Sequence, residues 1–254
     1  MEIKNKNIIL TGASSGIGKE LLSQLIRYDN MKIIAVARHI ENIPDIKGVV
    51  FPFSSDISTS DGVDKVFAYA QQVYGDTDIF IANAGFAYLE KLHAPDWKHI
   101  EDIFSLNVFS QVYALEKLMQ QGDNHKTFVS VVSGVALVSL PGYSLYCSTK
   151  AAIHQFAETF RYEKSKNLHL MSVYPVATRT SFFNKATNKE NTPLPFPQQN
   201  TDIVARKIIQ GIEKDKKKVY PSLLFRISYP LMRTFPFLGK IYSMIEKHKV
   251  KNWI

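Results

Sequence analysis

The feature that most constrains the fold is a regular alternation of short apolar runs with longer segments of helical periodicity. Strands alternating with helices at this spacing predict right-handed crossovers, and therefore a parallel sheet with helices on both faces. We expect a doubly wound α/β domain of about seven strands. The predicted strands are Asn7–Leu10, Lys32–Ala37, Val49–Phe51, Ile79–Ala82, Lys126–Val132, His169–Tyr174 and Lys218–Tyr220, with helices near 16–28, 61–74, 97–121, 147–165 and 201–213.

A glycine-rich segment, Thr-Gly-Ala-Ser-Ser-Gly-Ile-Gly at 11–18, follows the first predicted strand. In doubly wound sheets ligands bind beyond the carboxyl ends of strands, where a helix N-terminus can bind a pyrophosphate. The glycine spacing matches neither a P-loop nor the GxGxxG fingerprint. It predicts a dinucleotide-binding turn, with an ordinary strand-to-helix turn as the alternative. The candidate cofactor-binding residues are Gly12, Ser14, Ser15, Gly16, Ile17 and Gly18.

The second predicted strand ends at Arg38, and no carboxylate follows before Glu41. NAD-binding proteins place an acidic residue here for the ribose 2′-hydroxyl, whereas the 2′-phosphate of NADP favours a cation. Arg38 therefore predicts NADP(H) over NAD, unless it is an ordinary surface arginine.

A tyrosine and a lysine four residues apart on a helix could serve hydride-transfer chemistry, because both side chains lie on one face. Four such pairs occur, so the spacing alone decides nothing: Tyr28/Lys32, Tyr113/Lys117, Tyr146/Lys150 and Tyr162/Lys166. Only Tyr146/Lys150 opens a predicted helix shortly after an apolar strand, and that strand ends beside Ser133. Position therefore selects Tyr146 and Lys150.

Together these motifs resemble the short-chain dehydrogenase/reductase family in its one-domain form, from residue 5 to about 220. The order of the motifs and the thirteen-residue interval between Ser133 and Tyr146 carry the resemblance. Besides the glycine turn, the matching residues are Asp56, Ile57, Asn83, Ala84, Gly85, Asn107, Ser133, Tyr146, Lys150, Pro175 and Thr180. One departure is Val176, where the family usually has glycine after the proline.

The resemblance implies a Rossmann-type fold and a role for each matching residue. Asp56 would contact the adenine, Asn83 to Gly85 would stabilise the sheet beside the cofactor, and Thr180 would hold the nicotinamide amide. Ile57 and Pro175 are further cofactor-binding candidates. Asn107 would hold a water that resupplies protons through Lys150. A homodimer or homotetramer is expected.

The expected reaction interconverts a carbonyl and an alcohol with NADP(H). Tyrosine has a pKa near ~10, and a cation one helical turn away favours the phenolate, so Lys150 should lower the pKa of Tyr146. Ser133 would hydrogen-bond to the substrate oxygen. A 3-oxoacyl carrier protein reductase and a non-catalytic NADP(H)-binding regulatory protein stay open as alternatives.

The segments around the predicted site are apolar. Phe182, Phe183 and a proline-rich run at 192–197 follow the sixth strand and read as a lid over the substrate. Leu137, Val138, Leu140 and Tyr143 lie between Ser133 and Tyr146. These segments favour a hydrophobic small-molecule substrate, although such a loop can be apolar simply to pack on the domain.

Composition excludes several other classes. The single cysteine, Cys147, permits no intrachain disulfide, which fits the cytoplasm, and the amino-terminal segment is too charged for a signal peptide. Cys147 points away from Tyr146 around the helix and is expected to pack. The seven histidines show no metal-ligand spacing, so no metal is expected. No nucleic-acid-binding motif is present.

The net charge of +8 lies in the last 41 residues, where ten Lys and Arg face only Asp215 and Glu246. We therefore divide the chain into a dinucleotide-binding and catalytic domain, 1–221, and a basic, aromatic extension, 222–254, on or near the substrate side. The extension is too interrupted by charges and prolines to span a bilayer. It fits peripheral contact with a membrane surface, or else a cover for the pocket or a subunit interface.

Overall fold

The computed structural model describes residues 2–187 and 192–253 and contains a seven-stranded parallel sheet in the order β3-β2-β1-β4-β5-β6-β9. The seven predicted strands are confirmed, with ends that differ by at most three residues. The chain passes from one half of the sheet to the other between β3 and β4, which is the doubly wound pattern. The strands are β1 Asn7–Thr11, β2 Lys32–Ala37, β3 Val50–Ser54, β4 Ile79–Ala82, β5 Lys126–Val131, β6 Leu168–Val173 and β9 Lys218–Val219.

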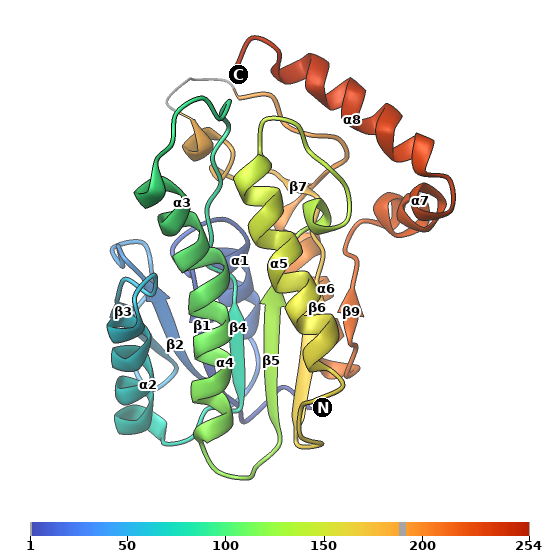
Figure 1. Cartoon of the computed structure of the whole chain (residues 1–254). Coiled ribbons are helices and arrows are strands. Elements are labelled where there is room, and N and C mark those ends of the chain that lie inside the picture. The colour runs from blue at the N-terminus through green and yellow to red at the C-terminus, as the bar shows by residue number, and fades with distance from the viewer. Residues whose placement is uncertain (1, 188–191, 254) are drawn as a thin grey trace.

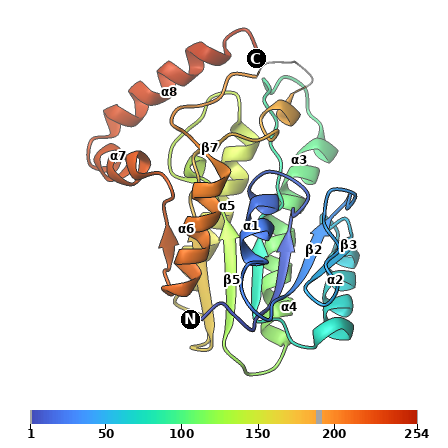
Figure 2. The same ribbon diagram turned by 180° about the vertical axis from the view of Figure 1, so that it is seen from behind.

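Helices cover both faces of the sheet (Figures 1 and 2). One face carries α1 (Gly16–Leu25) and α6 (Thr201–Glu213), and the other carries α2 (Ser60–Tyr74), α4 (Ser110–Gln120) and α5 (Ser144–Phe160). Successive strand residues point to opposite faces. Thus Ile8 and Leu10 pack in the core with α1 and α6, whereas Ile9 packs in the core beneath α2, α4 and α5.

The predicted helix at 97–121 consists of three consecutive parts. They are α3 (Trp97–Phe104), a π-helical segment η1 (Ser105–Phe109) and α4. A π-helical segment interrupts the regular hydrogen-bond ladder and often marks a functional site. Asn107 lies in this segment and is fully buried.

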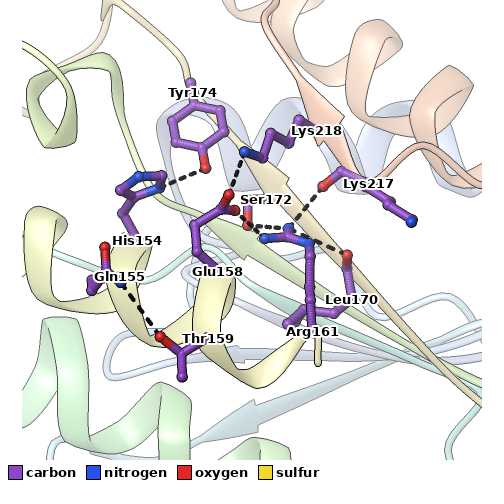
Figure 3. A network of polar contacts seen from close by, with 10 residues as sticks. All are labelled: His154, Gln155, Glu158, Thr159, Arg161, Leu170, Ser172, Tyr174, Lys217 and Lys218. Atoms are coloured by element: carbon purple, nitrogen blue, oxygen red, sulfur yellow. Dashed lines mark hydrogen bonds and ion pairs between the residues drawn. The ribbon is translucent and has the colours of Figure 1, made fainter. Parts of the chain in front are cut away.

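A polar network on α5 covers the short edge strand β9 (Figure 3). The guanidinium of Arg161 donates to the hydroxyl of Ser172 over 2.8 Å and to the carbonyl of Lys217 over 2.9 Å, and it pairs with Glu158. Glu158 also pairs with Lys218. The network ties the end of α5 to β6 and β9, so an edge of only two paired residues is held by side chains.

Two helices beyond β9 were not among the predicted elements: α7 (Leu223–Thr234) and α8 (Pro236–Val250). Both lie outside the doubly wound layers, at the end of the molecule that carries β7 (Figures 1 and 2). Phe225 of α7 is buried, and Ser243 of α8 donates to the carbonyl of Ser139 over 2.9 Å. The remaining short elements are η2 (Gly134–Ala136), β7 (Ala177–Thr178), η3 (Asn184–Ala186) and β8 (Gln198–Gln199).

Candidate active site

A cavity of about 930 Å³ lies beyond the carboxyl ends of the central strands. Its wall brings together residues from six strand ends and from α5, and almost all of the predicted site residues belong to it. Those that line it are Gly12, Ser14, Ser15, Gly16, Ile17, Arg38, Asp56, Ile57, Asn83, Ala84, Gly85, Ser133, Tyr146, Lys150, Pro175 and Thr180. Gly18 and Asn107 do not line it.

The glycine turn has the backbone that its sequence predicts. Gly12 and Gly16 have φ of 68° and 55°, a conformation that L side chains rarely adopt. Gly18 serves packing, since a Cβ there would lie 2.1 Å from the carbonyl oxygen of Gly12. Ser15 precedes α1 without using its side chain as a cap. Ser15 and the first residues of α1, Gly16 and Ile17, line the cavity, and a helix N-terminus at such a place suits phosphate oxygens.

Thr11 and Asn83 join the end of β1 to the end of β4. The hydroxyl of Thr11 donates to the carbonyl of Ile81 over 3.2 Å and accepts from the backbone amides of Asn83 and Ala84 over 3.0 and 3.1 Å. The side-chain amide of Asn83 donates to the carbonyl of Thr11 over 3.0 Å. These bonds fix the floor of the cavity next to the glycine turn.

Arg38 and Asp56 lie together at one end of the cavity. Burial alone would raise the pKa of the Asp56 carboxyl. Hydrogen bonds from the hydroxyl and amide of Ser58, over 2.7 and 3.0 Å, and the charge of Arg38 together outweigh burial, so the pKa of Asp56 is lowered. Arg38 itself is exposed, and His39 beside it also lines the cavity. His39 adds a second basic side chain that the sequence analysis does not predict.

Ser133, Tyr146 and Lys150 line the opposite end of the cavity. Ser133 lies two residues beyond the end of β5 and has a φ of 137°, an unusual value for a residue with a side chain and one typical of strained functional sites. Its hydroxyl donates to the carbonyl of Pro175 over 3.5 Å and accepts from the backbone amide of Val135 over 3.3 Å. Lys150 lies one helical turn further along α5, with its Nζ 5.7 Å from the centre of the Tyr146 ring. The same Nζ donates to the carbonyl of Val131 over 3.1 Å.

Burial dominates the ionisation of this pair. It raises the pKa of Tyr146, and the nearby hydroxyl of Ser133 lowers it by less. Burial also lowers the pKa of Lys150 to about 8. The pKa of Tyr146 is thus raised, whereas the charge of Lys150 alone would lower it. The difference arises because both groups lose their surrounding water on burial, which cannot be read from their spacing in the sequence.

Asn107 lies behind the cavity wall. Its side-chain amide donates to the carbonyl of Phe86 over 2.9 Å and to the hydroxyl of Thr149 over 3.1 Å, and its oxygen accepts from the Phe86 amide. A Cβ on Gly85 would lie 2.9 Å from Asn107 Oδ1 and 3.6 Å from Lys150 Nζ. Asn107 therefore positions the backbone next to Lys150, and glycine is needed where the two side chains meet.

The rest of the wall is apolar. Val138, Leu140, Phe182 and Phe183 contribute to it, and the rings of Tyr146 and Phe182 are 5.5 Å apart. Leu137 and Tyr143 were also expected here but pack in hydrophobic clusters instead. Val176, which departs from the family pattern, lines the wall beside Pro175. Part of the predicted lid, 188–191, lies outside the described residues.

Helix α7 supplies part of the wall that the sequence analysis does not predict. Phe225, Ser228 and Met232 line the cavity, and their spacing of three and four residues places them on one face of the helix. Tyr242 of α8 joins them. This periodicity is the signal that could have revealed α7.

The other chemical candidates lie elsewhere. Cys147 packs with its Sγ 3.8 Å from the Leu140 carbonyl, and burial raises its pKa. The tyrosines and lysines of the other three pairs are absent from the cavity wall. Among residues 2–187 and 192–253, no three His, Cys, Asp or Glu side chains form a group that could hold a metal ion.

Comparison with known proteins agrees with the fold. The family model for short chain dehydrogenases matches residues 6–191. A 3-ketodihydrosphingosine reductase of Dictyostelium discoideum is 27% identical, and the alignment covers 93% of this chain and 81% of the relative.

Two solved structures share the fold. A short chain dehydrogenase of Burkholderia cenocepacia in complex with NADP superposes with a TM-score of 0.82 at 22% identity, over 96% of this chain and 99% of the other. A short chain dehydrogenase/reductase of Burkholderia phymatum in complex with NAD superposes with a TM-score of 0.81 at 17% identity, over 94% of this chain and 96% of the other.

The sheet order and the cavity beyond its strand ends define a doubly wound α/β fold, and the match to the dehydrogenase model identifies an oxidoreductase. The chain belongs to the short-chain dehydrogenase family. Within the described residues, each helix is too short or too polar to cross a membrane.

Proposed function

We propose that this oxidoreductase interconverts a hydrophobic carbonyl compound and its alcohol, using NADP(H) and Tyr146 as the proton donor and acceptor. The observation that carries the proposal is that Ser133, Tyr146 and Lys150 share one cavity with the glycine turn and Arg38. The Dictyostelium relative supports it, because its name denotes the reduction of a 3-keto group.

The cavity fits a nicotinamide dinucleotide along its length. The amides at the start of α1 and the hydroxyl of Ser15 would hold the pyrophosphate, and Arg38 with His39 would hold a 2′-phosphate. Asp56 and Ile57 would border the adenine. Pro175 and Thr180 would border the nicotinamide, where the methyl of Thr180 packs against Gly16. The dinucleotide supplies or accepts the hydride.

The chain's own residues would handle the proton and the orientation of the substrate. Ser133 would donate a hydrogen bond to the carbonyl oxygen, which holds that oxygen next to Tyr146. Because burial raises the pKa of Tyr146, its hydroxyl keeps its proton at neutral pH and can donate it to the developing alkoxide. Lys150 would hold the ribose and return a proton to Tyr146, and Asn107 would fix the backbone around Lys150.

The substrate class follows from the apolar end of the cavity. Phe182, Phe183 and Met232 surround the space next to Tyr146, and a chain or ring would lose its water there. The nearby charged lining residues, Lys98, Asp102 and Lys185, include both signs. An uncharged ketone with a long apolar group fits this wall better than a charged one.

The test is turnover of a panel of ketones with NADPH and NADH, read by absorbance, for the wild-type chain and for Tyr146→Phe. We expect NADPH-dependent reduction of apolar ketones, and a fall in kcat of about 10²-fold or more in the variant with unchanged NADPH binding. Undiminished turnover in Tyr146→Phe would show that another group delivers the proton. Tight NADPH binding with no turnover of any ketone or alcohol would favour a regulatory protein.

The remaining proposals concern the cellular compartment and the oligomeric state. The lone Cys147 supports a reducing compartment such as the cytoplasm. Light scattering on the purified chain tests the expected homodimer or homotetramer. A 3-oxoacyl carrier protein reductase would be favoured if carrier-bound substrates reacted better than free ketones of the same length.

A further inference from the structure

Helices α7 and α8 expose an apolar surface that the proposed catalytic function does not use. Nine of the sixteen large hydrophobic side chains exposed in the described residues lie between 223 and 245, each 49% to 70% exposed. Monomeric soluble proteins rarely expose a contiguous patch of this kind without a partner. The apolar residues of this surface are Leu223, Leu224, Ile227, Leu231, Phe235, Phe237, Ile241, Met244 and Ile245.

Each helix divides into a buried and an exposed apolar face. On α7, Leu223, Ile227 and Leu231 recur every four residues on the exposed face, while Phe225 and Met232 point into the fold. On α8 the spacing of Phe237, Ile241 and Met244 gives a second exposed line. Phe225 and Met232 already pack α7 against the fold, so the exposed line of Leu223, Ile227 and Leu231 is not needed to hold the helix in place.

Basic side chains lie next to these apolar lines. Lys240, Lys247 and Lys251 are seven and four residues apart, so they form one line along α8 and its C-terminal cap, beside Met244. All three are exposed, as are Arg226 and Arg233 of α7, and these five cations form no ion pair with the described residues. Glu246, the only acidic side chain in residues 222–253, is 3% exposed and pairs with Lys249 over 2.6 Å.

The mouth of the cavity opens beside this surface. Leu224 and Phe196 both line the cavity, and they are 49% and 58% exposed. The buried face of α8 holds the Phe196 loop in place, because the Glu246 carboxylate accepts from the Phe196 amide over 3.2 Å. The exposed apolar surface and the entrance to the cavity are therefore fixed relative to each other.

We propose that the α7–α8 surface docks on an anionic lipid bilayer and turns the mouth of the cavity toward it. Apolar side chains flanked by unpaired cations are what a helix lying in the headgroup region requires. A second copy of the chain is a poorer partner, since self-association would bring ten exposed cations together with no exposed acidic side chain in the described residues of α7 and α8 to oppose them. Delivery of a lipid-dissolved ketone to Tyr146 follows only if the proposed function also holds.

The experiment is co-sedimentation of the full-length chain with vesicles of phosphatidylglycerol and phosphatidylcholine, compared with pure phosphatidylcholine. We expect binding to the anionic vesicles that weakens as salt is raised. Each cation near such a surface contributes about fivefold to affinity, so Lys240→Gln, Lys247→Gln and Lys251→Gln together should weaken binding about 100-fold. A second variant, Ile241→Gln with Met244→Gln, should weaken it at least tenfold.

The matched control removes three exposed lysines elsewhere, with Lys32→Gln, Lys166→Gln and Lys207→Gln, and should leave vesicle affinity within about twofold of wild type. An equal loss in this control would overturn the proposal, because net charge alone would then explain binding. So would absence of binding to anionic vesicles, or binding only to an acidic acyl carrier protein. A dimer that Ile241→Gln and Met244→Gln convert to monomer would also overturn it, in favour of a second copy.

Kinetics separate this proposal from the catalytic one. With a short, water-soluble ketone, the triple lysine variant should keep the wild-type kcat and KM. With a long-chain ketone dissolved in the anionic vesicles, its apparent KM should rise by tenfold or more. Vesicle binding without turnover of any ketone would refute the catalytic proposal and leave the membrane proposal standing.

Discussion

We propose that the choice of cofactor depends on Arg38. Because the guanidinium would pair with a phosphate, Arg38→Ala should weaken NADPH binding by about 1.5–3 kcal/mol and leave NADH binding nearly unchanged. Fluorescence titration with both nucleotides measures this, and Arg206→Ala on α6 is the control. An unchanged preference for NADPH in Arg38→Ala would transfer the role to His39 or another side chain.

Lys150 should set the upper pH limit of carbonyl reduction. Burial lowers its pKa to about 8, so the free enzyme loses this charge as the pH rises through that value, while Tyr146 keeps its proton. We therefore expect kcat/KM for NADPH, which reports ionisations of the free enzyme, to be level below about pH 8 and to fall above it.

Lys150→Arg provides the matched variant, because a guanidinium keeps its proton throughout this range. Whatever activity it retains should show no fall near pH 8. A wild-type profile that stays level up to about pH 9.5 would contradict the assignment.

Single residues also show where sequence reasoning stops. Gly12, Gly16 and Tyr146 were predictable because a turn or a helix position requires them. Asn107 was predicted as a residue of the site, yet its side chain is occupied by Phe86 and Thr149. Such three-dimensional partners leave no trace in the spacing of residues along the chain.

At the scale of elements, the short edge strand β9 depends on the Glu158 network of α5 (Figure 3). Burial raises the pKa of Glu158, but the hydrogen bond from Lys218 and the charges of Arg161 and Lys218 outweigh it, so the pKa is lowered. A carboxyl with a lowered folded-state pKa contributes stability above its unfolded value, and this contribution is lost as the pH falls through the folded value.

Glu158→Gln should therefore lower Tm most near neutral pH, and its difference from wild type should shrink below about pH 4.5. Thermal unfolding between about pH 7 and 3 gives the Tm of the wild type and of Glu158→Gln, and the exposed Glu163→Gln is the control. A Tm difference that does not change with pH would mean that packing, and not ionisation, stabilises the edge.

Elements differed in how well they could be predicted. A central strand such as β4 was found because it is buried on both faces and reads as a continuous apolar run. Helices α7 and α8 were missed because Pro230 and the apolar residues on both of their faces obscure the helical period. The position of α8 depends on contacts with Phe196 and Ser139, which are distant in sequence. Phe225 of α7 likewise packs in a cluster with Val132 and Tyr174.

At the scale of the whole molecule, α7 and α8 form an additional layer that closes one side of the cavity. Phe225 is the link between this layer and the catalytic domain, because it is 4% exposed and packs beside Tyr220 and Tyr229. A Cβ on Gly134 would lie only 3.1 Å from the Phe225 ring, so the ring supports the strained turn that presents Ser133.

Phe225→Ala should therefore have two effects. The free energy of unfolding should fall by about 3 kcal/mol, near the lower end for removal of a buried ring, since the site borders an existing cavity. Turnover of a short ketone should fall as well, because Ser133 loses its support. Chemical denaturation and steady-state kinetics measure the two effects, and the exposed Leu231→Ala should leave both unchanged. Wild-type stability in Phe225→Ala would show that the catalytic domain does not depend on its last two helices, and wild-type turnover would show that Ser133 holds its position without them.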